Sequence, residues 1–206
     1  MGDAKGVAHL RKADPVMRTL IEEHGKPRRA RRTARDDHYG ALVRSIVGQQ
    51  LSTKAARSIY RRLTDRFGGR PPTPEEVLAD EPEELRAAAG LSRAKVSFLR
   101  SLAEHVQSGD LDLDGMDSLS DEDVVAALIA VKGLGQWSAD MFLMFHLERP
   151  DVLAVGDLGI RRAVQRAYGL DELPGPTELE RIAEPWRPYR TLACRYLWAT
   201  LDNEPV

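Results

Sequence analysis

The chain has 206 residues, of which 30% are charged and 42% are hydrophobic, and its formal net charge is -2 at pH 7. Its apolar runs are far too short to cross a bilayer, and its first residues show no signal-peptide core. Cys194 is the only cysteine, which excludes an internal disulfide and a metal cluster built on cysteines. We therefore expect a globular, cytoplasmic protein, folded as one large domain or as two small ones that share a cleft.

The overall charge gives no argument for nucleic-acid binding, but the charges are unevenly distributed. Acidic residues collect at 75–84 and 110–123, whereas the stretch 28–35 is strongly basic and contains Arg28, Arg29, Arg31, Arg32 and Arg35. Such a run is either a solvated loop or a segment that contacts phosphates and binds less tightly as salt rises. The sequence leaves both interpretations open.

Helix signals follow one another along the chain, and strand signals are nearly absent. Asp14-Pro15 predicts a helix to about residue 23, followed by helices at about 37–49 and 52–67. Thr73 to Glu76 forms a capping box with Pro at the first helical position, and Ser120 with Asp123 forms a weaker version. Further helices are expected at about 82–89, 92–108, 121–131, 136–147, 158–168, 177–184 and 189–200. This pattern predicts an all-α helical bundle.

Two glycines separate apolar helical stretches within residues 131–160, whose sequence is VKGLGQWSADMFLMFHLERPDVLAVGDLGI. The run from Val124 to Val131 is typical of a buried helix, residues 132–135 of a tight turn, and Gln136 onward of a second helix. Glycines allow positive φ and close backbone approach, and the amides at a helix start attract anions, so this hairpin is suited to hold a phosphate. The same letters also fit a helix C-cap followed by an ordinary turn.

This stretch resembles the helix-hairpin-helix motif and the Gly/Pro-Asp segment of the DNA glycosylase superfamily, and it is most similar to the 3-methyladenine, or alkylated-base, branch. Further pieces occur in the family's order and extend the resemblance over most of the chain: HLRKADPVMRTLIEEHG at 9–25, ALVRSIVGQQLSTKAA at 41–56 and EPWRPYRTLACRYLW at 184–198. The resemblance implies two helical lobes with the active cleft between them. A central lobe at 36–147 would include the hairpin at about 121–147, and a second lobe, made of 1–35 and 148–206, would carry the catalytic aspartate.

Asp157 is the candidate for that aspartate. It follows Gly156 and precedes the helical stretch LGIRRAV, so we expect it at a helix N-terminus, where amides and the helix dipole favour negative charge. From the pattern alone an ordinary Asp N-cap is the simpler explanation. The resemblance implies the catalytic role, because a glycosylase needs a carboxylate where positive charge develops on the deoxyribose. Asp151, just after Pro150, is interpreted as a turn residue.

A base inside a duplex must be rotated out before it is excised, and the gap must be filled. Gln49-Gln50-Leu51 lies between two expected helices, and the resemblance implies that Gln50 or Leu51 plugs the vacated stack. A polar turn between helices explains the same residues.

Trp137 and Trp198 match base-pocket positions of the family, and an aromatic face can stack on a positively charged alkylated base. Core packing is the general alternative for any Trp, and Trp186 is expected to be structural. Relatives that also cut the strand use a lysine at the position of Trp137, or at a comparable cleft position, to form a Schiff base. Trp137 therefore favours hydrolysis that leaves an abasic site.

The resemblance further implies that Gly133 and Gly135 donate their amides to a phosphate beside the lesion. It also implies a monovalent cation, Na⁺ or K⁺, at main-chain carbonyls and one hydroxyl of the hairpin, those of Ile129, Val131, Leu134 and Ser138. No cofactor is expected to be required, and no pattern of a catalytic transition-metal site is present in the sequence.

The leading hypothesis is a monofunctional DNA glycosylase, acting as a monomer on double-stranded DNA with alkylated bases. It would remove purines such as 3-methyladenine and 7-methylguanine and so initiate base excision repair. One alternative is a non-catalytic helix-hairpin-helix module that binds damaged DNA. Another is a bifunctional glycosylase-lyase for oxidised bases, against which Trp137 counts.

Overall fold

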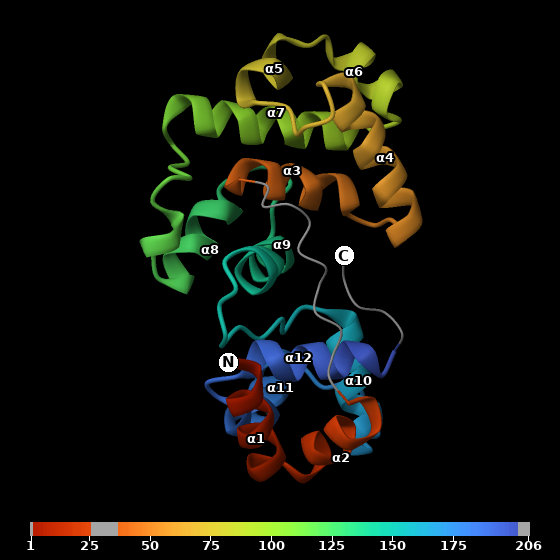
Figure 1. Cartoon of the computed structure of the whole chain (residues 1–206), viewed down its shortest axis with the longest axis vertical. Coiled ribbons are helices and arrows are strands. Elements are labelled where there is room, and N and C mark those ends of the chain that lie inside the picture. Colours follow the sequence, from red (N-terminus) through yellow and green to blue (C-terminus); the bar gives the residue numbers. More distant parts are fainter. Residues whose placement is uncertain (1, 26–36, 202–206) are drawn as a thin grey trace. The chain divides into compact units, whose positions relative to one another are not determined.

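The computed structural model describes residues 2–25 and 37–201, and within these ranges all regular secondary structure is helical (Figure 1). The expected all-α class is confirmed. The described residues form two compact units: a central unit of residues 37–142, and a terminal unit of residues 2–25 and 143–201. The arginine run at 28–35 lies outside the described residues, and the lobe boundaries expected at 36 and 147 stay a prediction.

The central unit is built around a long helix, α7 (Arg93–Ser108), which packs against α3 (His38–Gly48), α5 (Pro74–Ala79) and α6 (Pro82–Ala89). In Figure 1, α7 runs between α5 and α3. Helix α4 (Thr53–Arg66) contacts α3 and α6. After a short 3₁₀ turn, η1 (Met116–Ser118), helices α8 (Asp121–Ile129) and α9 (Gln136–Met141) pack on each other as the expected hairpin.

The terminal unit combines the two ends of the described chain. Helices α1 (Gly2–Ala13) and α2 (Pro15–His24) pack together and against α12 (Arg190–Ala199), which also contacts α10 (Leu158–Tyr168). Helix α11 (Pro176–Ala183) leads into the 3₁₀ turn η3 (Glu184–Trp186). A short π-helix, η2 (Phe142–His146), continues directly from α9. None of the helices in either described range has the length and hydropathy needed to cross a membrane.

Asp14 ties the terminal unit together. It caps α2 as the sequence predicts, since its Oδ1 accepts the amides of Val16 and Met17. Its Oδ2 accepts the Tyr168 hydroxyl and, at 2.9 Å, the indole N–H of Trp186. Burial, reinforced by the hydrogen bond and charge of Asp14, raises the pKa of Tyr168. Because its carboxylate is bonded on both oxygens, Asp14 can remain 5% exposed at little cost, and Trp186 has a structural contact.

Helix α1 was not expected from the sequence. Gly6 lies in its interior, where glycine lowers helix propensity, and the helix shows no sharp apolar stripe. The structure shows what the glycine is for: a Cβ at this position would lie 2.8 Å from Leu192 Cδ2 and 3.0 Å from Tyr189 Cδ1. Close packing against the start of α12 therefore outweighs the local preference.

Candidate active site

The turn of the helix-hairpin-helix runs from Ala130 to Gly135, between α8 and α9. Gly133 has φ +92°, and a Cβ there would stand 2.1 Å from the Phe98 ring. Gly133 is therefore required both for its backbone conformation and for its contact with α7. Gly135 differs: its φ of −119° suits any residue, and the space beside it is open.

No side chain caps the start of α9. Its N-cap is Gly135, whereas the N-caps of α4, α7, α8 and α10 are Ser or Asp residues that accept an amide hydrogen bond. Gly135 and Gln136 are exposed, and the apolar side chains of Ile129 and Trp137, on the two sides of the turn, are 50% and 37% exposed. The hairpin thus presents main-chain amides with apolar surface beside them, an arrangement suited to an anion held close to the backbone.

Residues 48–51 form the turn between α3 and α4, here called the 48–51 turn. Leu51 N–H donates to Gly48 O at 3.3 Å, and the backbone angles of Gln49 (φ −52°, ψ 131°) followed by Gln50 (φ +57°) are those of a type II turn. Gln50 occupies the position that normally requires glycine or asparagine. The side chains of Gln50 and Leu51 are exposed, as a plug requires.

Gln49 connects this turn to the hairpin. Its Nε2 donates to Gly133 O at 2.8 Å and to Ser138 Oγ at 3.4 Å, so one side chain bridges segments more than 80 residues apart. The sequence assigned the plug to Gln50 or Leu51 and gave Gln49 no role. A local pattern could not have found this bond, because it depends on how α3 packs beside the hairpin.

In the terminal unit, Asp157 is the N-cap of α10, as the sequence predicts. Its Oδ1 accepts the amide of Ile160 at 2.8 Å and the indole N–H of Trp198 at 3.0 Å. The side chain is half-buried. Two donors on one oxygen fix the orientation of the carboxylate.

Trp198 is buried and packs against another aromatic ring. It is 1% exposed in the whole chain, and its ring packs on Phe145 with centroids 5.8 Å apart. Its indole N–H positions Asp157, and its expected stacking on a base stays a prediction. Gly159 completes the arrangement, since a Cβ there would lie 2.9 Å from Asp157 Oδ1 and 3.4 Å from the indole of Trp198. Sequence reasoning missed this close approach.

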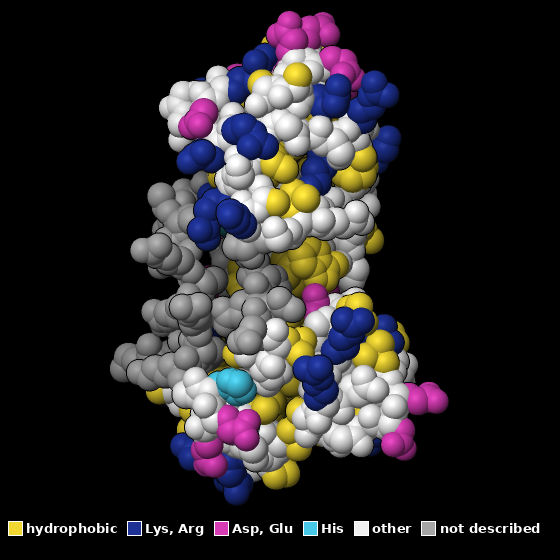
Figure 2. All heavy atoms as spheres, turned by 90° about the vertical axis from the view of Figure 1, so that its right-hand side faces the viewer, with side chains coloured by type: hydrophobic (Ala, Val, Ile, Leu, Met, Phe, Trp, Pro, Cys, Tyr) yellow, Lys and Arg dark blue, Asp and Glu magenta, His cyan; other side chains and the backbone are white. Residues whose placement is uncertain are grey.

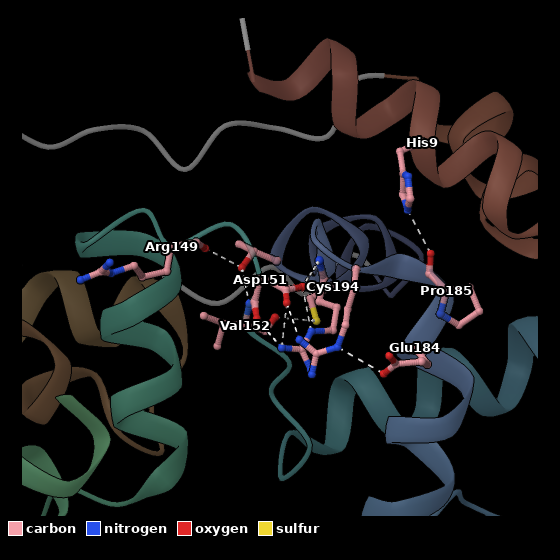
Figure 3. A network of polar contacts seen from close by, with 10 residues as sticks. His9, Arg149, Asp151, Val152, Glu184, Pro185 and Cys194 are labelled. Carbon is pink, nitrogen blue, oxygen red and sulfur yellow. Dashed lines mark hydrogen bonds and ion pairs between the residues drawn. The ribbon is translucent and has the colours of Figure 1, made fainter. Parts of the chain in front are cut away.

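The segment that leads to Asp157 is anchored to the start of α12 (Figure 3). Thr191 Oγ1 donates to Arg149 O at 2.7 Å and accepts the amide of Val152 at 3.1 Å. Asp151 forms ion pairs with Arg187 and Arg190 at 2.6 and 2.8 Å. Asp151 is therefore engaged in holding this segment in place.

The candidate residues fall into two groups. The central unit brings together Gln49, Gln50, Leu51, Gly133, Gly135, Trp137 and Ser138, and the terminal unit brings together Asp157, Gly159 and Trp198. Over residues 2–25 and 37–201, no group of three His, Cys, Asp or Glu side chains is arranged to hold a metal ion. The first group offers amides and an exposed turn, and the second offers an oriented carboxylate.

Comparison with known proteins places these features in context. A family model described as HhH-GPD superfamily base excision DNA repair protein matches residues 43–188. The chain is 34% identical over 198 residues to the DNA-3-methyladenine glycosylase 1 of Schizosaccharomyces pombe, covering 95% of this chain and 86% of the relative. A solved complex of the Schizosaccharomyces pombe 3-methyladenine DNA glycosylase with abasic DNA is similar at TM-score 0.87 and 33% identity, over 97% of both chains. A DNA-3-methyladenine glycosidase from Bacillus halodurans gives TM-score 0.73 and 38% identity, over 91% of this chain and 89% of that one.

Proposed function

Because the chain belongs to the HhH-GPD superfamily of base excision DNA repair proteins, we propose that it is a monofunctional DNA glycosylase. It hydrolyses the bond between deoxyribose and an alkylated purine, such as 3-methyladenine or 7-methylguanine, and so initiates base excision repair. The observation that carries this proposal is Asp157, a carboxylate oriented by Trp198 and by the first turn of α10, in a chain whose relatives are named as 3-methyladenine glycosylases.

The chemistry asked of Asp157 is electrostatic. As the C–N bond breaks, the electron pair leaves with the base and positive charge develops on the sugar, which an adjacent carboxylate stabilises. Water then attacks the anomeric carbon and loses a proton, and an abasic site remains. The hydrogen bonds from Ile160 and Trp198 support this role, because they orient the carboxylate before the reaction begins. The carboxylate then needs no reorientation as positive charge develops on the sugar.

Trp137 supports hydrolysis without strand cleavage. A lyase reaction needs an amine that attacks the sugar and forms a Schiff base, and the side chain directly after the hairpin's first helical residue is an indole. Trp137 is also well exposed, at 37%, so its face is accessible for stacking on a base.

The hairpin and the 48–51 turn supply the DNA contacts of this proposal. Gly133 and Gly135 bring amides to a phosphate, and Gln50 or Leu51 fills the vacated stack. Neutral oxygens at Ile129, Val131, Leu134 and Ser138 suit a hard monovalent cation, Na⁺ or K⁺, that would help to neutralise the same phosphate. Val131 O already accepts the amide of Leu134 at 3.1 Å and therefore has one remaining lone pair for such an ion.

Helix α4 offers a basic surface next to the 48–51 turn. Lys54, Arg57 and Arg61 are exposed at helical spacing and line a shallow depression with Ser58. Figure 2 shows Lys and Arg side chains on the face of the central unit that carries α4. These charges supply sequence-independent attraction to the DNA backbone, in spite of the net charge of the chain.

The direct test is base release. Duplex DNA methylated in vitro is incubated with the protein, and the released bases are identified by chromatography. We expect free 3-methyladenine and 7-methylguanine, uncut abasic sites and no adduct after borohydride treatment. Tight binding without release would support the non-catalytic module, and a trapped covalent adduct would support the glycosylase-lyase.

A further inference from the structure

Lys95, on α7, reaches the end of α3. Its Nζ donates to the main-chain oxygens of Val47 and Gln49 at 2.7 and 2.8 Å. The side chain is half-buried, and burial lowers the pKa of its ammonium group. The cation is placed where α3 ends and its last carbonyls carry partial negative charge. Lys95 therefore fixes the backbone from which the 48–51 turn departs.

The turn needs such support because its conformation is unfavourable for its sequence. Gln50 has φ +57°, a region that residues with a Cβ rarely adopt, and its exposed side chain forms no hydrogen bond with the described residues. The conformation is instead held by two hydrogen bonds of the preceding residue, Gln49. Its main-chain oxygen accepts one from Lys95, and its side chain donates the other to Gly133 O. Strained residues persist where neighbours over-determine them, and they concentrate at functional sites.

We propose that Lys95, acting with Gln49, is a positioning residue that keeps the 48–51 turn preformed for insertion into a vacated base stack. This inference rests on the proposed function and adds a specific device to it. A turn that is ordered before binding loses less conformational entropy when it enters the duplex, so the device assists extrusion of a paired base. It has no part in the bond cleavage itself.

The test separates extrusion from cleavage. Lys95→Met keeps an unbranched apolar stem and removes the donors. Single-turnover release of 7-methylguanine is measured from one oligonucleotide in two forms, paired with its complement and single-stranded. For Lys95→Met we expect the rate on the paired form to fall about tenfold or more, and the rate on the unpaired form to stay within about twofold, because an unpaired base needs little extrusion. Lys95→Arg, which retains cationic donors, should restore most of the paired rate.

Arg100 provides the matched control. It lies on the same helix, and its Nη1 donates to the main-chain oxygens at the end of α5, those of Val77, Leu78 and Asp80, at 3.2, 3.3 and 3.3 Å. Arg100→Met therefore removes the same kind of contact away from the 48–51 turn. It should lower the unfolding temperature and leave the ratio of paired to unpaired rates unchanged.

A second measurement does not depend on base release. A duplex with a tetrahydrofuran abasic analogue beside 2-aminopurine reports insertion of the turn by a rise in fluorescence. We expect the full rise with the unmutated protein and a smaller one with Lys95→Met. If the unmutated protein gives the full rise and Lys95→Met a smaller one, but no base is released, the proposed function fails and this inference stands. The inference is overturned if no rise occurs, or if Lys95→Met changes the paired and unpaired rates equally or not at all.

Discussion

At the hairpin of the central unit, the groups offered to a ligand belong to the main chain, whereas in the terminal unit they belong to one side chain. The amides at Gly133 and Gly135 are presented by the path of the backbone, and their neighbours matter mainly by the space that they leave. Asp157 is presented by bonds from Ile160 and Trp198. Substitutions should therefore act on binding through shape at the hairpin, and on catalysis through charge and orientation at Asp157.

Asp157→Asn should have the largest effect on base release. Asn keeps the N-cap bond but loses the negative charge, so we expect base release to fall at least about a hundredfold while affinity for DNA is retained. Asp37→Asn is the matched control, because Asp37 caps α3 in the same way, by accepting the amide of Gly40 at 2.7 Å. Single-turnover kinetics and a binding assay on both variants decide the point. Near-normal release by Asp157→Asn would remove the assigned role.

Gly133→Ala tests the importance of shape at the hairpin. The new methyl group would overlap the Phe98 ring and strain a positive φ, so the free energy of unfolding should fall by about 2 to 3 kcal/mol, with weaker DNA binding. Gly135→Ala meets open space and should change the unfolding free energy by less than about 0.5 kcal/mol. It should still weaken DNA binding, because its methyl group would stand where a phosphate approaches. Urea denaturation and fluorescence anisotropy measure the two quantities, and equal unfolding effects of the two variants would contradict the distinction.

Trp198→Phe tests the orientation of the carboxylate in the terminal unit. It removes one donor to Asp157 and keeps most of the ring packing, so base release should fall about tenfold with little change in DNA affinity. Trp186→Phe removes the same kind of donor from Asp14 and should lower the free energy of unfolding by about 1 to 2 kcal/mol, with the rate unchanged. A reversed pattern, in which Trp198→Phe affects only stability, would argue against a positioning role.

The smallest effect on the protein is expected at the capping box of α5, which lies outside both the hairpin and the Asp157 site. The hydrogen bond from Arg70, followed by that from the Thr73 amide, lowers the pKa of Glu76 from its ordinary 4.5 to about 2. The contribution of Glu76 to the free energy of unfolding is therefore complete above the pKa that Glu76 has in the unfolded chain. It is lost as pH falls through about 2. Glu76→Gln should flatten this part of the stability profile, measured by urea denaturation between pH 5 and pH 2, and leave base release at neutral pH unchanged.

Features with a local cause were predictable from the sequence. The caps at Asp14, Thr73, Ser120 and Asp157 appear as expected, because a capping side chain acts within three residues of itself. The hairpin turn was located by its glycines for the same reason. Which of the two glycines is conformationally required was not predictable, since it depends on Phe98 of α7.

Contacts between distant segments escaped the sequence analysis. Trp198 and Asp157 are 41 residues apart, and Lys95 and Gln49 are 46 apart, so neither pair leaves a periodic signal. Helix α1 was missed because Gly6 weakens the local preference and gains its value only against α12. Asp157 itself was selected by family resemblance, since an Asp at an N-cap is ordinary by pattern alone.

Helix α12 sets the spacing between two contacts in the terminal unit. Thr191 anchors the segment that leads to Asp157, and Trp198 holds the carboxylate itself. The two are seven residues apart, about two helical turns, and so point to the same side of the helix. A single inserted or deleted residue between them would rotate one by about 100° relative to the other. This stretch should therefore tolerate no change in its length.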